Sequence, residues 1–412
     1  MWKGWRLFHA TDFQSLMYPC FTFGRILGLF PYKINASTIE VSKQCYILST
    51  VIICICCIFD LLLIHDFITK INLKSVIRTL EGVSYYTFTG FIVIVTHILN
   101  GPRMRLLQTI LDISSKLPPE SYQKLSRLIH IKDIFGIILI VVQLCAYFLK
   151  ADMDEINYAT AMPMMFSTGF FFTVYLTLQE FHINMLYVNS VCVLKACFKR
   201  INENVAYMQE LIVNDTKPSV SKWTCYFPRN QFLLINLKSL KKQHLMVSDA
   251  VKMLNIIFSL QLLATIIMCF CNITFELYFY AVRWQNGLFI RLSWDFLDMF
   301  FITLMFHITK IILLVWVCET GKNQAKEIGT TIHDVLNKTS DGQLKDELQL
   351  FSLQILHRDN TFSAKGLTVD ATLLATMVGN ITTYMLILIQ FLVMLHSCDK
   401  KPGTNIINNS VI

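Results

Sequence analysis

The sequence predicts an all-α membrane protein with seven transmembrane helices, and three observations support this fold class. Of the 412 residues, 54% are hydrophobic and only 16% are charged, and the mean hydropathy is +0.51. A water-soluble globule of this composition would lack the polar surface needed to cover itself. Apolar runs long enough to cross a bilayer also recur along the whole chain, which indicates one membrane-embedded unit rather than several soluble domains.

The chain opens with a polar and basic segment, residues 1–45, and the first strongly apolar run begins near Tyr46. We therefore expect no cleavable signal peptide of the usual length. Within this segment, residues 16–31 are apolar but contain Arg25. That pattern is typical of a helix that lies at the membrane surface rather than crossing it.

Seven runs match the roughly 20 apolar residues that a helix needs to cross a hydrocarbon core about 30 Å thick. They occupy residues 46–65, 84–101, 133–149, 159–182, 254–281, 294–317 and 369–396. Between the fourth and fifth runs, within residues 190–252, the helical pattern continues in segments 190–214 and 230–252, so we expect these two helices to extend below the membrane. Residues 46–317 would then hold six transmembrane helices.

The orientation follows from lysine and arginine, because these charges are retained on the cytoplasmic side of a membrane. The N-terminal segment and the loops after spans two, four and six hold 27 of the 36 lysines and arginines; the other loops and the tail hold 8, and Lys310 lies inside span six. The N-terminus is therefore predicted in the cytoplasm, and residues 397–412 form an extracellular tail. This orientation is opposite to that of a G-protein-coupled receptor.

Residues 318–368, between spans six and seven, form a charged segment with two amphipathic helical patterns. Their apolar positions are Ala325, Ile328, Ile332 and Val335, and then Leu344, Leu348, Phe351 and Ile355. We interpret the segment as cytoplasmic anchor helices. Their apolar faces would pack either against the inner membrane surface or against other subunits beneath the membrane.

Motifs of enzymes are missing from the sequence: there is no HExxH, no GxSxG and no glycine-rich phosphate loop. Most of the 13 cysteines lie in apolar runs or basic loops, so we expect no disulfide framework, no metal and no cofactor. Nucleic-acid binding is not expected either. A membrane-embedded hydrolase is a minor alternative, because His97, His182 and His307 fall near the cytoplasmic ends of spans two, four and six.

Span seven carries a polar stripe on one helical face. The stripe consists of Thr372, Thr376, Asn380, Thr383 and Gln390. At 100° per residue these positions fall together, with Ile387 among them. A polar stripe at this depth must face protein or water rather than lipid. It serves either helix packing, with threonines bonding their own backbone, or a water path lined by a ring of Gln390 amides.

The end of span seven also carries a longer motif. Thr383-Tyr384, five hydrophobic residues and Gln390-Phe391 match the TYhhhhhQF motif of the insect gustatory receptors, where h is hydrophobic. The stretch from Phe351 to Gly379 is similar to the C-terminal region of that family. Length, span number and orientation agree as well, so the chain resembles insect gustatory receptors throughout, most specifically near its C-terminus.

This resemblance implies a ligand-gated, non-selective cation channel of four subunits, alike or mixed, in the plasma membrane of sensory neurons. Small-molecule tastants would open it and so mediate acceptance or avoidance. Each subunit would give span seven to a central pore, with Gln390, Phe391 and Ile387 as pore or gate residues. Thr383 and Tyr384 would be gating or packing residues.

Two alternatives to a gustatory receptor remain. An insect odorant receptor subunit would share the fold, but the intact Gln390-Phe391 pair disfavours it. A membrane transporter would be expected to show inverted repeats and discontinuous helices, and the sequence indicates neither.

The resemblance further implies a ligand pocket within each subunit, open to the outside among the outer halves of spans two to six. The candidate lining residues are Tyr85, Tyr86, Phe88, Gln143, Tyr147, Phe166, Glu276 and Asp298. Aromatic rings with a few polar groups suit a small polar or amphiphilic tastant. Glu276 and Asp298 are alternatively a vestibule that attracts cations, or partners of neighbouring hydroxyls.

The predicted extracellular tail contains an Asn-Asn-Ser sequon that begins at Asn408. We expect a glycan there, because such sequons are modified on the extracellular side. The sequons at Asn35, Asn214 and Asn337 lie in predicted cytoplasmic segments and are expected to stay unmodified.

Overall fold

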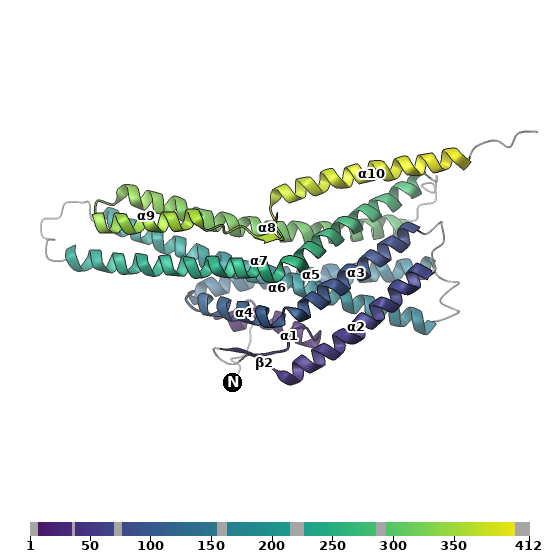
Figure 1. The fold of residues 1–412 in the computed structure, drawn as a ribbon, viewed down its shortest axis with the longest axis horizontal. Coiled ribbons are helices and arrows are strands. Elements are labelled where there is room, and N and C mark those ends of the chain that lie inside the picture. The colour runs from purple at the N-terminus through teal and green to yellow at the C-terminus, as the bar shows by residue number, and fades with distance from the viewer. Residues whose placement is uncertain are drawn as a thin grey trace, which may run out of the picture.

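The fold is an elongated bundle of helices (Figure 1). The computed structural model describes residues 7–34, 38–69, 76–154, 163–214, 226–285 and 294–399. The helices are α1 (Phe13–Ile26), α2 (Lys43–Thr69), α3 (Val76–Ile98), α4 (Asn100–Ser114), α5 (Pro119–Asp154), α6 (Pro163–Asn214), α7 (Tyr226–Gln285), α8 (Trp294–Lys338), α9 (Gly342–His357) and α10 (Ala371–Asp399). Two antiparallel hairpins accompany them, β1 (Tyr32–Ile34) with β2 (Ile39–Val41) and β3 (Ser363–Ala364) with β4 (Leu367–Thr368).

Each predicted span falls on a helix, in the order α2, α3, α5, α6, α7, α8 and α10. Among the described residues, six helices are long and apolar enough to cross a membrane, or seven if α3 and α4 count as one span bent by 68°. At this bend, the Tyr32 hydroxyl donates to the backbone oxygen of Asn100 at 2.6 Å. The seven-helix membrane fold predicted from the sequence is therefore confirmed.

Three helices are much longer than a bilayer is thick. Helices α6, α7 and α8 have 52, 60 and 45 residues, which at 1.5 Å per residue gives about 78, 90 and 68 Å. A hydrocarbon core of about 30 Å covers less than half of each. Their remaining length runs together with α9 at one end of the bundle, on the left of Figure 1. The expected helix extensions within residues 190–252 are part of this bundle.

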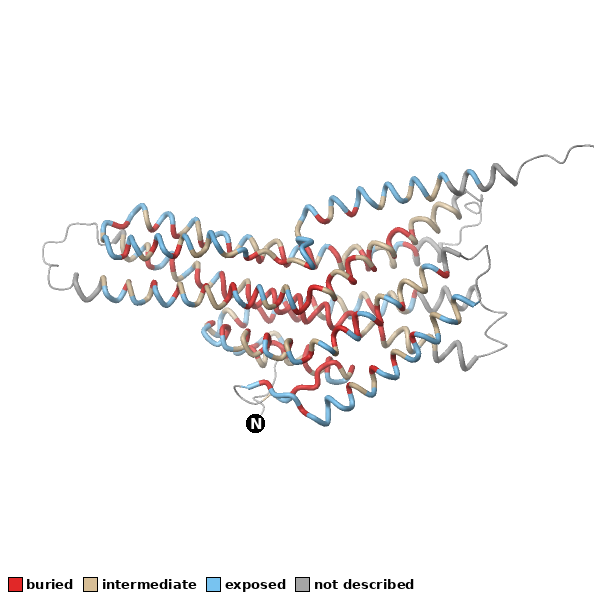
Figure 2. Tube along the Cα trace, in the orientation of Figure 1, coloured by how far each residue is buried: buried red, intermediate tan, exposed pale blue. Residues whose placement is uncertain are grey.

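Burial is concentrated around α6 and decreases towards α2 and α10 (Figure 2). In the most apolar stretch of each helix, 89% of the residues are buried for α6, against 22% for α2 and 11% for α10. Tyr187, Val191 and Phe198 of α6 are fully buried, together with Phe258 of α7 and Ile328 of α8. Helix α6 is thus the centre of the packing, and α10 has the smallest share of it.

The apolar faces of the predicted anchor helices are covered by the same chain. Ile328 and Ile332 of α8 and Leu348 and Phe351 of α9 are fully buried and belong to one core with α6 and α7. Neither interpretation made from the sequence anticipated that the chain itself covers these buried positions. A sequence pattern shows that a face is apolar but not which surface will cover it.

Helix α1 differs from the expected surface helix. It begins with a capping box between Asp12 and Ser15, and Phe13, Leu16 and Phe21 are almost completely buried in the main core. Its apolar face is therefore covered by protein. The chain then turns at Gly28, whose φ of +73° is readily adopted only by glycine.

Candidate pore helix and ligand-binding region

The polar stripe that the sequence predicts for span seven lies on an exposed face of α10. Leu373 and Met377 are buried, and α10 packs on α7 and α8. The polar stripe faces away from the chain, and its exposed members are Thr372, Thr376, Asn380, Thr383 and Gln390. Ile387 is 43% exposed.

The threonines and the amides of the stripe differ in their hydrogen bonding. Thr376 donates to the Thr372 carbonyl at 2.9 Å and Thr383 to the Gly379 carbonyl at 3.0 Å. The threonines are therefore satisfied by their own helix. No hydrogen bond of the Asn380 or Gln390 amide is found within the described part of the chain.

Tyr384 lies beside the stripe rather than on it. Its ring meets Phe270 of α7 edge-on, with centroids 5.8 Å apart, although 52% of the residue is exposed. Phe391 continues the same helix, but its side chain lies outside the described residues.

Residues 361–370, which we call the elbow, lead the chain from α9 into α10 and contain the β3–β4 hairpin. The hairpin loop is Lys365-Gly366, and both residues have positive φ, +52° and +87°. Asp370 accepts from the Thr372 backbone amide at 3.1 Å and is 3.4 Å from the Lys322 Nζ of α8. Burial alone would lower the pKa of Lys322, but the carboxylates of Glu319 and Asp370 raise it above its usual range.

The predicted ligand residues on α3 are held by α6. The Tyr86 hydroxyl lies 2.7 Å from Thr173 Oγ1 and the Tyr85 hydroxyl 2.8 Å from Thr177 Oγ1. Both threonine hydroxyls donate to carbonyls of their own helix, so the tyrosines are the donors in these pairs. Phe88, one turn further along α3, packs against the main core.

A second group of polar residues lies along one face of α8, at Thr303, His307 and Lys310. Each bonds to a different helix. Thr303 accepts from Gln143 of α5 at 3.2 Å, His307 Nε2 accepts from Asn272 of α7 at 3.4 Å, and Lys310 donates to a carboxylate of α6. This column joins all three helices to α8, and it includes the predicted ligand residue Gln143.

Glu180 of α6 is the carboxylate paired with Lys310. Both of its oxygens accept from the Lys310 Nζ, at 2.8 and 2.9 Å, and the two side chains are only 4% and 12% exposed. Asn184 donates to Glu180 at 2.8 Å and accepts from Thr265 of α7 at 3.3 Å. The ion pair is therefore embedded in a hydrogen-bonded network.

Two buried atoms in the column make no hydrogen bond among the described residues: Gln143 Oε1 and His307 Nδ1. Because the Asn272 amide donates to His307 Nε2, the ring hydrogen is on Nδ1. The two atoms are thus one free acceptor and one free donor. His307 lies about 20 Å along α8 from the first residue of that helix.

The remaining predicted site residues are less completely placed. Glu276 is buried in α7. Tyr147 lies on α5, Phe166 on α6 and Asp298 on α8, but their side chains are outside the described residues. Asn408 also lies outside them.

The three histidines of the hydrolase alternative are held by different neighbours. His97 Nε2 lies 3.2 Å from Thr50 Oγ1, His182 meets the Phe23 ring edge-on, and His307 bonds to Asn272. In the described residues, no group of three or more histidines, cysteines or carboxylates could hold a metal ion. The hydrolase interpretation has no support in this part of the chain.

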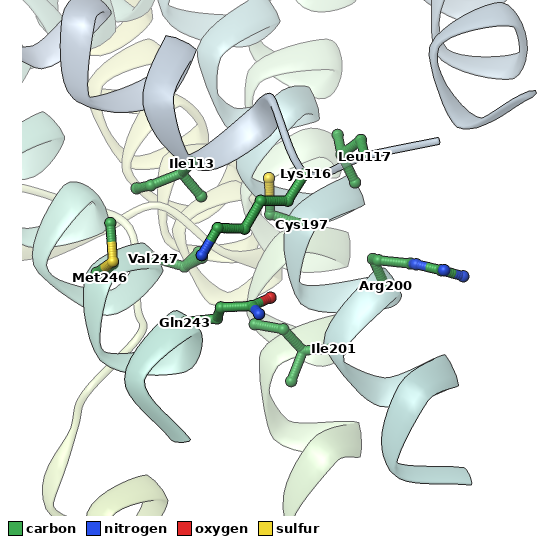
Figure 3. Close-up of a pocket in the computed structure, with 9 residues that line it drawn as sticks. All are labelled: Ile113, Lys116, Leu117, Cys197, Arg200, Ile201, Gln243, Met246 and Val247. Carbon is green, nitrogen blue, oxygen red and sulfur yellow. The ribbon is translucent and has the colours of Figure 1, made fainter. Parts of the chain in front are cut away.

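Two hollows lie away from the predicted site residues. The first lies among the end of α4, α6 and α7, and Figure 3 shows Lys116 reaching across it while Arg200 points away. Cys197 lies at this hollow, where burial raises the pKa of its thiol to about 12 and keeps it protonated. The second hollow, between α2 and α6, is lined by Ile52, Ile55, Cys56, Phe59, Phe171, Phe172 and Tyr175.

Curated relatives of the chain are chemosensory proteins of Drosophila melanogaster. It is 33% identical to putative gustatory receptor 28b over 153 residues, which are 36% of this chain and 32% of the relative. It is 29% identical to putative gustatory receptor 28a over 171 residues, 41% and 38% of the two chains. To the gustatory receptor for sugar taste 43a it is 27% identical over 169 residues, 40% and 37%. The chain spans about a third of the length of these relatives.

The fold matches a solved structure over nearly its whole length. The insect olfactory receptor OR5 from Machilis hrabei has a TM-score of 0.69 at 13% identity, covering 92% of this chain and 98% of that one. Its complex with eugenol has a TM-score of 0.70 over the same coverage. At this identity the likeness establishes the fold.

A family model described as 7tm Chemosensory receptor matches residues 17–394, almost the entire chain. The match extends from α1 to residue 394 in α10 and so reaches every predicted span. Together with the gustatory receptor relatives, it confirms the resemblance first indicated by the motif in α10. The chain belongs to the 7tm Chemosensory receptor family of multi-span membrane receptors.

Proposed function

We propose that the chain is a gustatory receptor, a subunit of a ligand-gated, non-selective cation channel that small-molecule tastants open. It acts in the plasma membrane of sensory neurons with the N-terminus in the cytoplasm. The observation that carries the proposal is the polar stripe of α10, which the single chain leaves uncovered.

The stripe argues for a pore because of where it lies. In hydrocarbon, the Asn380 and Gln390 amides would each lose several kcal/mol of hydrogen bonding, on the order of 2–7. They need water or a second protein surface, and the described part of the chain does not cover them. Four copies around an axis would give these amides a water-filled path, while Leu373 and Met377 hold α10 to its own subunit. Ile387, Phe391 and Gln390 then form the constriction, with Thr383 and Tyr384 behind it.

The free atoms of the α8 column support a ligand pocket in the outer part of the same subunit. Gln143 Oε1 can accept a hydrogen bond and His307 Nδ1 can donate one. A hydroxyl group can donate to the first atom or accept from the second, so each of them suits a hydroxylated tastant. Tyr85, Tyr86, Phe88, Tyr147, Phe166, Glu276 and Asp298 complete the proposed lining.

An odorant receptor subunit is the second candidate, because the matched fold is that of an insect olfactory receptor. The sequence relatives favour gustation, since the curated proteins reported above carry gustatory names. The Gln390-Phe391 pair favours it too. A gustatory receptor is therefore the first proposal and an odorant receptor subunit the second.

Expression in cells followed by current recording tests the proposal. We expect at least one class among sugars, nucleosides and bitter alkaloids to evoke a cation current. Gln390→Ala should shift its reversal potential in mixed sodium and calcium solutions, because it removes an amide from the pore wall. Val378→Ala, on an exposed face of α10 away from the stripe, is the matched control. Silence to every tastant, or unchanged ion selectivity in Gln390→Ala, would contradict the pore.

A further inference from the structure

Two side chains of α7 hold the backbone of the elbow. The Asn255 amide donates to the Thr361 carbonyl at 2.7 Å and accepts from the Ser363 amide at 3.2 Å. One turn further along α7, the Ser259 hydroxyl accepts from the Lys365 amide at 2.8 Å. Asn255 therefore presents to the elbow the same donor and acceptor that the edge of a neighbouring β-strand would present.

The elbow has a backbone conformation that is unfavourable without support from the rest of the chain. Lys365 has a φ of +52°, in the left-handed region that is unfavourable for residues other than glycine. Such a residue persists when its surroundings determine it. The bond from the Lys365 amide to Ser259, which is 94% buried with a relative exposure of 6%, is one such determinant.

Helix α8 holds the elbow from the other side. Phe362 is buried against Gly321, where an added Cβ would lie 2.9 Å from the ring. The Lys322 ammonium lies 3.4 Å from Asp370, the last residue before α10. The elbow is thus bonded to α7 through its backbone and to α8 through packing and charge.

Helix α7 also reaches the column of polar residues on α8. Asn272 bonds to His307 and lies on the same continuous helix as Asn255, 17 residues and about 26 Å further along. A displacement at the outer half of α7 therefore reaches the elbow through one rigid element. Covalently, the elbow leads directly into α10.

We propose that Asn255 and Ser259 are positioning residues that couple α7 to the pore helix. This rests on the proposed function, in which α10 lines the pore. Ligand binding at the outer half of α7 shifts the helix, and the three side-chain bonds pass the shift to the start of α10. Without these bonds, the ligand still binds but opens the pore less.

Hydrogen exchange of the purified full-length chain in detergent tests the clamp without any ligand. In Asn255→Leu and in Ser259→Ala, amide exchange in residues 361–370 should accelerate by up to about tenfold, the effect of losing one or two bonds. Asn255→Asp still accepts from Ser363 but cannot donate to Thr361. Its exchange rate in residues 361–370 should lie between those of the wild type and Asn255→Leu. Gln243→Leu is the matched control, because among the described residues that amide bonds only to Ser239 of its own helix. Exchange equal to the control would overturn the clamp.

Current recording tests the coupling. With a fixed mixture of D-fructose, uridine and quinine as the probe, maximal current per surface subunit should fall at least threefold in Asn255→Leu. The half-maximal concentration should change less than twofold. A general folding defect would instead lower surface number and leave the current of each remaining channel intact.

The outcomes separate the two proposals. Silence of every variant, wild type included, overturns the channel function and the coupling with it. Wild-type current together with accelerated exchange and undiminished current per subunit in Asn255→Leu overturns the coupling alone. Reduced current per subunit with accelerated exchange supports both.

Discussion

Glu180 and Lys310 form a buried ion pair between α6 and α8. Its charges lie almost completely out of contact with solvent, and in such surroundings each would be very costly without the other. Asn184 supplies a further donor to the carboxylate. The two residues therefore act as one unit that ties α6 to α8.

Breaking this unit should cost more than removing it. Lys310→Met leaves the Glu180 charge unpaired, and we expect a loss of about 3–5 kcal/mol. Glu180→Gln combined with Lys310→Met should lose less than Lys310→Met alone, because no buried charge remains. Thermal melting of the detergent-solubilised chain, followed by size-exclusion chromatography, measures the difference. Additive losses in the double variant would contradict the idea that the pair acts as one unit.

Sequence reasoning reached part of the site at this scale. Gln143 was selected as a polar group among aromatic residues, and the structure joins it to Thr303. His307 was not among the ligand-binding residues predicted from the sequence, because its partner Asn272 lies on another helix. A signal was nevertheless present: Thr303, His307 and Lys310 lie at i, i+4 and i+7, as the polar residues of span seven do.

Helix α8 contains two glycines whose surroundings differ sharply. A Cβ at Gly321 would lie 2.9 Å from Phe362 Cε2 and 3.4 Å from Val191 Cγ1, whereas a Cβ at Gly329 would meet Ile355 at an ordinary 3.6 Å. The close approach at Gly321 brings α8 against the elbow. Glycine there allows α6, α8 and the elbow to meet at one point.

Alanine at these two positions should act in opposite directions. Gly329→Ala should be neutral or stabilise α8 by up to about 1 kcal/mol, the usual gain of alanine over glycine in a helix. Gly321→Ala should destabilise the chain by about 1–3 kcal/mol, because overpacking displaces a buried ring. Melting temperatures of the two variants in one detergent measure the contrast. Equal shifts would mean that Phe362 moves aside freely.

Elements were predicted unequally well. The seven spans followed from hydropathy, since a bilayer demands long apolar helices. The elbow did not, because its strands have two residues each and owe their geometry to Asn255 and Ser259 on a distant helix. The partners of the α8 and α9 faces were also out of reach, because amphipathicity does not identify a partner.

At the scale of the whole molecule, α6, α7 and α8 set the axis along which the chain lies. Their length beyond a bilayer requires a large aqueous portion. The charge distribution predicts that this portion lies in the cytoplasm and the end of α10 on the opposite side of the membrane. The orientation is an independent prediction that a chemical label can check.

Glycosylation at Asn408 provides that label. We expect the chain expressed in insect cells to lose a few kilodaltons on treatment with an endoglycosidase, about one N-glycan. Asn408→Gln should remove this shift, whereas Asn337→Gln should not change it. An N-terminal epitope should meanwhile be inaccessible to antibody until the cells are permeabilised. A labelled N-terminus on intact cells would reverse the orientation.

Because α6 is largely buried and α10 is largely exposed, substitutions in the two helices meet different constraints. A substitution in α6 meets neighbours encoded by the same gene, so a compensating change can arise in the same copy. The uncovered stripe of α10 has no such neighbours within the described chain. In the proposed channel, this stripe faces the neighbouring subunits, so a substitution there is tested against every subunit that packs beside it. Under that proposal, the interior of the receptor can change within one gene, whereas α10 is expected to change together with the subunits around it.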